Sequence, residues 1–409
     1  MATVRTRSPA PTMAVTRPTR CVAVYGQKGF AGLAQDHATR QQAHRGAVRP
    51  VQMEGDGRDG AFVPGNTGGA ACDSHERRIH TSRLWPRRNR AQTMGAKAMK
   101  LGIIGTGNVG CAIALATVTR GSAREIVLVN RTRKTAEAVA SDLRYGTPLT
   151  PRVDIRYGDY GELANAAVVL ITSGVNEKAG GATDRNDPLG RLGLLDKNAA
   201  IYRDIVPQIV QAAPKATLVA VTDPPDALAD IAREAAGHDR VLSTGTFLDS
   251  LRFRVHLGQY FGVDPAHVEA QVIGEHGTSQ VFLWSSARIA GVPMTALLAE
   301  RGEKLDDLRV QIENDVRYAN IAIIEGHDAS QYGIGIVSAR IAEMVLRDER
   351  AAIPIGSYQR ALGLTLSLPS VVGRVGVVSV LQPELSHEER SRLEKSVESL
   401  RNALETVRQ

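Results

Sequence analysis

Short apolar runs alternate with amphipathic stretches from residue 100 onward. The apolar runs predict β-strands at 100–105, 125–130, 168–172, 217–222 and 240–243. The stretches between them have helical spacing and predict α-helices at 108–120, 134–144 and 192–213. Strands that alternate with helices are typical of βαβ units, so this part of the chain predicts an α/β fold with a doubly wound parallel sheet.

The alternation fades after residue 246. Helical spacing continues at 301–325 and 338–348, and a long charged helix is expected at 387–408. This pattern favours a second domain of the α+β type. We therefore expect one domain at 99–246 and another at 247–409.

Residues 1–98 differ from the rest of the chain. They are rich in Arg, Pro, Gly, Ala, Gln and Thr and sustain no helical or strand period, which predicts a disordered basic extension. Three interpretations stay open. The natural start lies at Met94 or Met99, or the extension is a real tail, or it is a targeting segment, since no acidic residue precedes Asp36.

The basic charge of the chain is confined to this extension. The chain has 50 Lys and Arg and 43 Asp and Glu, of which 16 and 6 lie in 1–98, leaving 34 and 37 in 99–409. The predicted domains therefore lack the charge of a nucleic-acid-binding protein. No apolar run is long enough to cross a membrane, so we expect no membrane partner. Cys21, Cys72 and Cys111 form neither a disulfide framework nor a metal cluster, which fits a cytoplasmic protein.

A glycine-rich segment joins the first predicted strand to the first predicted helix. Its fingerprint residues are Gly105, Gly107, Asn108, Val109 and Gly110. In this context the G-x-G-x-x-G spacing indicates a Rossmann-type dinucleotide site, because the glycines permit a tight turn and a close approach of the pyrophosphate to the helix N-terminus. The alternative is a purely structural turn.

The second predicted strand ends without the acidic residue that normally binds the ribose 2′-hydroxyl. Asn130 stands there, followed by Arg131, Arg133 and Lys134. A guanidinium can bind a 2′-phosphate that a carboxylate would repel, so the cofactor is NAD(P), with NADP weakly favoured by Asn130 and Arg131. Asn130-Arg131-Thr132 also resembles the phosphate-reading stretch of NADP-dependent shikimate dehydrogenases. The alternative is that these are solvated surface charges and NAD is used.

Four polar residues suggest chemistry beyond cofactor binding. His276 lies between small residues after an apolar strand, in a segment that suggests a cleft. Asp249 and Arg252 are three residues apart and therefore share one helix face. Arg191 follows a loop rich in Gly and Asp. Taken singly, each has a structural alternative, such as a core histidine or a surface ion pair.

Residues 99 to about 405 resemble the lactate/malate dehydrogenase family. The resemblance rests on Gly274-Glu275-His276-Gly277, on Gly245-Thr246-Phe247-Leu248-Asp249 with Arg252, and on Arg191-Leu192 followed by Asp196-Lys197-Asn198. Residues 1–98 have no counterpart in the family. The resemblance implies a nicotinamide-dependent 2-hydroxyacid dehydrogenase that forms a homodimer or homotetramer.

The resemblance also implies a role for each residue. His276 is the acid/base, because an imidazole with a pKa near about 6.5, raised by a carboxylate, can give a proton to a carbonyl oxygen. Asp249 orients the ring, Arg252 binds the substrate carboxylate, and Arg191 polarises the carbonyl when its loop closes. Gly174 is assigned to the cofactor site. Neither zinc nor a Ser-His-Asp triad is indicated, because no H-E-x-x-H motif, cysteine cluster or nucleophile elbow is present.

Several substrate-site positions depart from the family or set its specificity. Asp223 stands where asparagine is usual, so an ionised side chain there can accept but not donate hydrogen bonds. Thr278 replaces an acidic or amide residue. Glu177 occupies the specificity position, where relatives that reduce oxaloacetate carry arginine, and Ser330 matches a small hydroxyl residue of the pocket wall.

Glu177 argues for a small monocarboxylic 2-oxo or 2-hydroxy acid and an L-lactate dehydrogenase-like activity. Malate dehydrogenase stays open, because the loop before Arg191 is longer than in most relatives and Lys178 or Arg185 could supply a cation from within it. A third possibility from another class is a dinucleotide-binding protein with little turnover, which Asp223 and Thr278 would allow.

Overall fold

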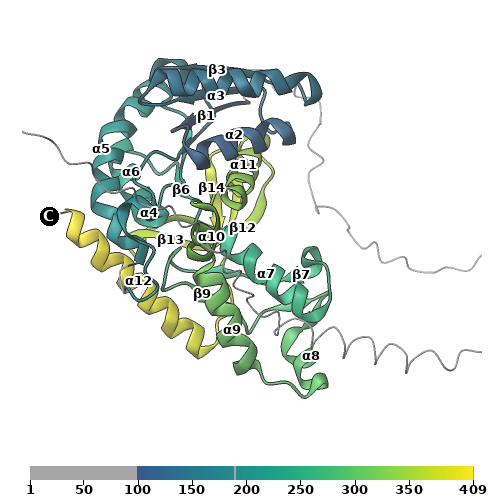
Figure 1. The fold of residues 1–409 in the computed structure, drawn as a ribbon. Helices are drawn as coiled ribbons and strands as arrows, with labels where there is room; N and C mark the ends of the chain where they lie inside the picture. Colours follow the sequence, from purple (N-terminus) through teal and green to yellow (C-terminus); the bar gives the residue numbers. More distant parts are fainter. Residues whose placement is uncertain (1–98, 188–189, 409) are drawn as a thin grey trace, which may run out of the picture. The chain divides into compact units, whose positions relative to one another are not determined.

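The computed structural model of the protein describes residues 99–187 and 190–408. The predicted extension at 1–98 lies outside the described residues. A nine-stranded sheet runs through the described part in the order β14-β13-β12-β6-β5-β4-β1-β2-β3 (Figure 1).

Six neighbouring strands of this sheet are parallel. They are β1 (Lys100–Ile104), β2 (Glu125–Val129), β3 (Asp154–Gly158), β4 (Val168–Ile171), β5 (Thr217–Ala220) and β6 (Val241–Ser243). Their order is that of a doubly wound dinucleotide-binding sheet, with the crossover point between β1 and β4. The predicted fold class is therefore confirmed. The sequence pattern missed β3, an edge strand in which two of five residues are buried.

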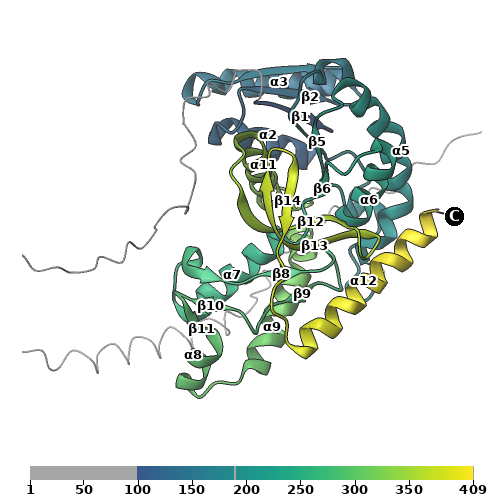
Figure 2. The same cartoon turned by 180° about the vertical axis from the view of Figure 1, so that it is seen from behind.

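Helices cover both faces of the parallel strands. One face packs on α2 (Asn108–Arg120), α3 (Arg133–Gly146) and α11 (Tyr332–Arg347), and the other on α5 (Leu195–Ala212), α6 (Pro225–Ala236) and α12 (His387–Arg408). Alternate residues of β2 enter the two cores, because successive side chains of a strand point to opposite faces. Figure 2 shows α12 running along α5 and α6 on the outside of this layer.

The second half of the chain extends the same sheet with three antiparallel strands. These are β12 (Ala351–Gln359), β13 (Leu364–Gly373) and β14 (Gly376–Val380), which the sequence pattern did not predict. β12 pairs with β6 through Gly356 and Ser243. A β-carbon on Gly356 would lie only 1.8 Å from the Ser243 hydroxyl, so this junction requires glycine.

Short elements build the rest of the second half. They are α7 (Phe247–Phe261), β7 (Val268–Glu269), β8 (Val272–Ile273), β9 (Val281–Phe282), β10 (Arg288–Ile289), β11 (Val292–Pro293), α8 (Met294–Arg301), α9 (Leu305–Arg317) and α10 (Ala319–His327). The loop before α5 contains α4 (Glu177–Gly180) and a 3-10 turn at Gly190–Leu194.

Three predicted helix boundaries were wrong. The helix expected at 301–325 is divided, because Gly302 ends α8 in the left-handed conformation and the chain turns again at Tyr318 between α9 and α10. The helix expected at 338–348 begins at Tyr332, and the one expected at 192–213 begins at Leu195 after the 3-10 turn. Among the described helices, none is both long and apolar enough to span a membrane.

Candidate active site

One pocket opens at the carboxyl ends of β4 and β5, beside the first turn of α2. Sheet-side residues and residues of the second half line it together: Val109, Thr172, Gly174, Val175, Asn176, Glu177, Arg191, Val221, Thr222, Asp223, Thr244, Leu248, Arg252, His276, Asn320, Ser330 and Ile334. Ligands of doubly wound folds bind at this edge of the sheet. The pocket thus brings residues predicted for the cofactor next to residues predicted for the substrate.

The glycine loop has the geometry that a dinucleotide pyrophosphate requires. Gly105 has a φ of +100°, and a β-carbon on Gly110 would lie 2.0 Å from the carbonyl oxygen of Gly105. A β-carbon on Gly107 would meet nothing within 4 Å, so the space in front of the α2 N-terminus is open. No side chain caps that terminus, which leaves its N–H groups for an anion. The loop therefore fits a dinucleotide.

The residue at the end of β2 holds the glycine loop with an amide. Asn130 accepts a hydrogen bond from the Thr106 N–H (3.2 Å) and donates one to the Thr132 carbonyl (3.2 Å). Arg131, the next residue, is exposed. The edge that would face the adenosine ribose therefore carries a neutral amide and a guanidinium instead of a carboxylate.

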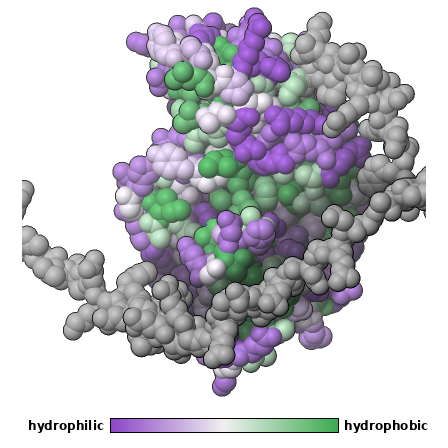
Figure 3. All heavy atoms as spheres, turned by 90° about the vertical axis from the view of Figure 1, so that its right-hand side faces the viewer, coloured by the Kyte–Doolittle hydropathy of each residue, from purple (hydrophilic) through white to green (hydrophobic). Residues whose placement is uncertain are grey.

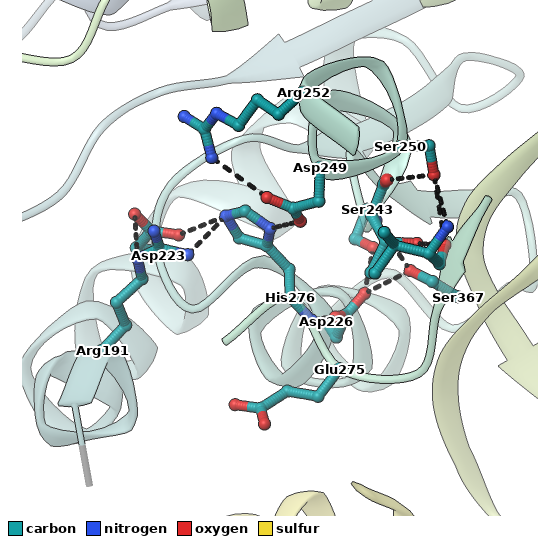
Figure 4. A network of polar contacts seen from close by, with 12 residues as sticks. Arg191, Asp223, Asp226, Ser243, Asp249, Ser250, Arg252, Glu275, His276 and Ser367 are labelled. Carbon is teal, nitrogen blue, oxygen red and sulfur yellow. Dashed lines mark hydrogen bonds and ion pairs between the residues drawn. The ribbon is translucent and has the colours of Figure 1, made fainter. Parts of the chain in front are cut away.

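His276 and Asp249 form a buried pair in which the ring and the carboxylate bond directly. The His276 Nδ1 atom lies 2.5 Å from Oδ2 of Asp249, which projects from the first turn of α7 (Figure 4). Burial alone would raise the pKa of Asp249, but His276, Arg252 and Arg191 hold it at about 2. Burial also opposes the charged form of His276, yet the Asp249 carboxylate raises the pKa of the imidazole above its ordinary value.

Two arginines flank this pair. Arg191, buried on the 3-10 turn before α5, has its Nη1 atom 2.7 Å from Nε2 of His276. A guanidinium only donates, so Nε2 is the acceptor and the proton of a neutral ring sits on Nδ1. Arg252, one turn after Asp249 on α7, donates from Nη1 to Oδ1 of Asp249 at 3.0 Å and lines the pocket.

Asp223 and Glu177 approach the same arginine. Asp223 follows β5 and precedes Pro224 through a cis peptide bond. Its carboxylate lies 3.7 Å from Nε of Arg191 and 3.8 Å from Nε2 of His276. Glu177 lies 3.8 Å from Nε of Arg191 and accepts a hydrogen bond from Asn320 at 3.1 Å. Both acidic side chains therefore belong to the pocket.

The two loop cations considered for a second substrate carboxylate lie elsewhere. Lys178 is paired with Asp328, and Arg185 forms a two-point pair with Glu325 at 2.6 and 2.9 Å, both among exposed side chains of α10 and its end. Neither lines the pocket. Ser330 does line it, whereas Thr278 lies against Gly190 in the segment that carries Arg191.

Sequence analysis missed two buried residues that position the site. Asp226, in the first turn of α6, accepts a hydrogen bond from the backbone N–H of His276 (2.7 Å) and one from Ser243 (2.5 Å). Asn198 donates to the carbonyl of Asp223 (2.7 Å) and accepts from the N–H of Val175 (2.7 Å). Asn198 stands in a segment that carries the family resemblance, but the sequence assigned no role to either residue.

The described residues contain no group of three or more His, Cys, Asp and Glu side chains placed to hold a metal ion. The side chains that line the pocket can transfer a proton at Nε2 of His276 and bind an anion through Arg191 and Arg252.

Comparison with known proteins agrees with this fold. Residues 99–243 match the lactate/malate dehydrogenase NAD binding domain, and residues 246–409 match the lactate/malate dehydrogenase alpha/beta C-terminal domain. The chain belongs to the lactate/malate dehydrogenase family. It is an oxidoreductase of that family and takes a nicotinamide cofactor.

Several similar proteins are L-lactate dehydrogenases by name. An L-lactate dehydrogenase of Deinococcus radiodurans is 44% identical over 304 residues, covering 74% of this chain and 97% of the relative. An L-lactate dehydrogenase of Thermus aquaticus is 41% identical, covering 75% and 98%. The crystal structure of a minor L-lactate dehydrogenase from Enterococcus mundtii superposes with a TM-score of 0.70 at 31% identity, covering 76% and 99%.

Proposed function

We propose that the protein interconverts a small monocarboxylic 2-oxo acid and its L-2-hydroxy acid, as an L-lactate dehydrogenase does. The observation that carries this proposal is that His276, Arg191 and Arg252 meet in the pocket that the glycine loop adjoins. Asp249 bonds to both His276 and Arg252. The relatives named above are L-lactate dehydrogenases by name, which supports the same activity.

In the reductive direction the side chains act on the carbonyl and carboxylate of the substrate. Arg252 binds the carboxylate, and Arg191 stabilises the negative charge that develops on the carbonyl oxygen. His276 gives that oxygen the proton on Nε2, while Asp249 keeps Nδ1 protonated and offsets the imidazolium charge. The nicotinamide supplies the hydride when it is bound.

Arg191 and His276 lie in direct contact in the pocket. At 2.7 Å the two nitrogens leave no room for a carbonyl oxygen between them. A protonated ring would place two donors face to face, so protonation of Nε2 favours withdrawal of the guanidinium. The substrate oxygen can then accept from both groups.

A second carboxylate has no partner in the pocket. Among the described residues that line it, the groups that can carry positive charge are Arg191, Arg252 and His276, which the substrate carboxylate and carbonyl occupy. Glu177 offers no positive charge for a further anion. This argues against malate dehydrogenase as the activity.

For the cofactor we propose NADP, with NAD also accepted, because the adenosine end carries Asn130 and Arg131. Asn130→Asp restores a carboxylate that repels a 2′-phosphate. This variant is expected to lose roughly tenfold or more in kcat/KM with NADPH and to keep or gain activity with NADH. A wild type that clearly prefers NADH would reject the proposal.

We also propose that residues 99–246 bind the dinucleotide and that residues 247–409 supply most of the substrate site.

We further propose that the protein is cytoplasmic and forms a homodimer or homotetramer. Apolar side chains are exposed on the face seen in Figure 3. Leu115 on α2 is 56% exposed, and Tyr332 and Ile336 on α11 are 62% and 56% exposed. All three line one groove between the two helices, which is a surface suited to a second copy.

The activity is tested by initial rates of the purified full-length protein. Pyruvate, 2-oxobutyrate, phenylpyruvate and oxaloacetate are each offered with NADH and NADPH. Oxaloacetate as the best substrate would favour malate dehydrogenase. Dinucleotide binding without turnover of any pair would favour the binding-protein alternative.

His276→Ala tests the proposed acid/base. It is expected to lower kcat by roughly 10²–10⁴-fold while cofactor affinity, measured by fluorescence titration, stays unchanged. His267→Ala is the control, because His267 is exposed and does not line the pocket. Near-normal turnover of His276→Ala would defeat the mechanism.

A further inference from the structure

Two carboxylates approach one nitrogen of the Arg191 guanidinium. Oε1 of Glu177, on α4, lies 3.8 Å from Nε of Arg191. Oδ2 of Asp223, which follows β5, lies 3.7 Å from the same atom (Figure 4). A different nitrogen of the guanidinium, Nη1, lies 2.7 Å from Nε2 of His276. The three contacts together decide which edge of the buried guanidinium faces the imidazole.

We propose that Glu177 and Asp223 are positioning residues that hold the Nε edge of Arg191 and thereby direct Nη1 at the reacting oxygen. The inference rests on the proposed function, because that function assigns Arg191 to the carbonyl of the 2-oxo acid. It also gives Glu177 a task in the reaction itself.

Buried amides fix the two carboxylates in turn. Asn320 of α10 is 4% exposed and donates to Oε1 of Glu177 at 3.1 Å. Asn198 of α5 is fully buried, donates to the backbone carbonyl of Asp223 at 2.7 Å and accepts from the N–H of Val175 at 2.7 Å. Val175 stands two residues before Glu177. Asn198 thus ties the segments of both carboxylates to the helix that directly follows the arginine.

Burial makes these ion pairs stronger than surface pairs. The side chain of Arg191 is 9% exposed, and those of Glu177 and Asp223 are 16% and 21% exposed, so water and salt screen them little. A guanidinium without a partner at this depth would carry a large desolvation penalty. Burial opposes the charged form of Arg191, but the negative charges of Asp223 and Glu177 raise its pKa above the ordinary value. The carboxylates therefore stabilise the charge as well as the orientation.

The distances leave the guanidinium room to adjust when the substrate enters. A direct N–H to oxygen bond is about 2.9 Å long, and both carboxylates are farther than that from Nε. A proton on Nε2 of His276 would repel Nη1, because both groups are then donors. The carboxylates can hold the displaced guanidinium through shorter contacts, so its Nε edge stays fixed while Nη1 turns to the carbonyl oxygen.

A double-mutant cycle tests the proposal by kinetics. Full-length wild type, Glu177→Gln, Arg191→Gln and the double variant are compared with pyruvate and saturating cofactor at about pH 8, where an ordinary glutamate is ionised. Glu177→Gln is expected to lower kcat roughly tenfold and to keep KM within about threefold, because Arg252 binds the substrate carboxylate. In the Arg191→Gln background the same substitution should change kcat by less than about threefold, because no guanidinium remains to be positioned.

The same cycle with Asp223→Asn is expected to give the same pattern. Glu177→Asp keeps the charge and should retain more of kcat than Glu177→Gln does. Glu398→Gln is the control, since Glu398 is an exposed carboxylate of α12, and it should leave kcat and KM unchanged. An equal loss of kcat with and without Arg191, or an effect confined to KM, would overturn the proposal, because the carboxylates would then not act through the arginine.

A second measurement does not depend on turnover. NMR of the full-length protein labelled with ¹⁵N-arginine follows the Nε–H group of Arg191, whose signal Arg191→Gln assigns. This proton is expected to exchange with water slowly in the wild type and faster in Glu177→Gln and Asp223→Asn, because each variant removes a charged partner. This result without turnover of any 2-oxo acid would defeat the proposed function but keep the positioning role. Turnover with an unchanged exchange rate would defeat the positioning role alone.

Discussion

At the residue scale, a buried carboxyl that does not line the pocket holds the backbone of His276, the proposed acid/base. Asp226 is fully buried and accepts hydrogen bonds from the His276 N–H, from Ser243 at 2.5 Å and from Ser367 at 3.4 Å (Figure 4). Burial raises the pKa of Asp226 to about 6, although these donors oppose the rise. The folded protein therefore retains a proton that the unfolded chain loses at lower pH.

This raised pKa predicts the sign of a stability change. Because the folded value lies above the unfolded one, the contribution of Asp226 to stability falls as pH rises through the window from about 4 to about 6. Asp226→Asn cannot ionise. The difference in free energy of unfolding between this variant and the wild type should therefore rise in favour of the variant by roughly 3 kcal/mol from pH 4 to pH 8. Urea unfolding followed by circular dichroism measures the difference.

The control for this prediction is Asp204→Asn, which removes an exposed carboxylate of α5. Its difference from the wild type should stay within about 0.5 kcal/mol at both pH values. A pH-independent difference for Asp226→Asn would contradict the ionisation that the prediction assumes.

The residues of the site differed in how far sequence could predict them. His276, Asp249 and Arg252 sit in short signatures whose spacing fixes which side chains share a face, and the structure brings them together. Asp226 and Asn198 act through backbone groups of residues that are distant in the chain. Such contacts depend on how the elements pack, so the sequence alone did not indicate what either side chain holds, even though Asn198 lies in a segment that resembles the family.

At the element scale, the turn between β1 and α2 uses two glycines for different purposes. A β-carbon at Gly110 would collide with the Gly105 carbonyl oxygen at 2.0 Å, whereas one at Gly107 would enter open space. Gly110→Ala should therefore destabilise the fold by roughly 1–3 kcal/mol. Gly107→Ala should leave the melting temperature unchanged and weaken dinucleotide binding by roughly tenfold or more, because the new methyl group occupies the approach of the pyrophosphate.

Thermal unfolding and fluorescence titration of the same two variants test this assignment. Each variant serves as the control for the other, since the substitution is identical and the positions are three residues apart. Loss of stability in Gly107→Ala, or an unchanged stability in Gly110→Ala, would contradict the two roles.

The elements differed in predictability for a physical reason. Interior parallel strands such as β1 and β4 are buried on both faces, so they appear as continuous apolar runs. β3 lies at the sheet edge, and its polar and apolar residues are mixed. β12, β13 and β14 contain Gly and Ser, and β12 and β13 also contain Pro, so these strands do not appear as continuous apolar runs. α12 was predicted at its observed bounds because it is long and amphipathic.

At the scale of the whole molecule, the continuous sheet couples the two halves of the site. β6 of the dinucleotide-binding part pairs with β12 of the second half, and Ser243 at that junction donates to Asp226, which in turn binds His276. His276, the proposed acid/base, is thus anchored to the same sheet that carries the glycine loop. A substitution that weakens the pairing of β6 with β12 should therefore lower kcat more than it lowers the affinity for the dinucleotide.

The apolar groove between α2 and α11 predicts self-association. Leu115 and Ile336 are each 56% exposed and line this groove. If a second copy covers them, Leu115→Asp with Ile336→Asp introduces buried charge and should weaken association by roughly 100-fold or more. Analytical ultracentrifugation should then find the wild type as a dimer or tetramer and the double variant shifted towards the monomer.

Leu149→Asp is the matched control, because Leu149 is 94% exposed and lies outside the groove. It should sediment like the wild type. Equal dissociation of both variants would point to a general effect of added charge, and a monomeric wild type would remove the groove as an interface. Since the groove includes the α2 face behind the glycine loop, dissociation should also raise the KM for the cofactor more than the KM for the 2-oxo acid.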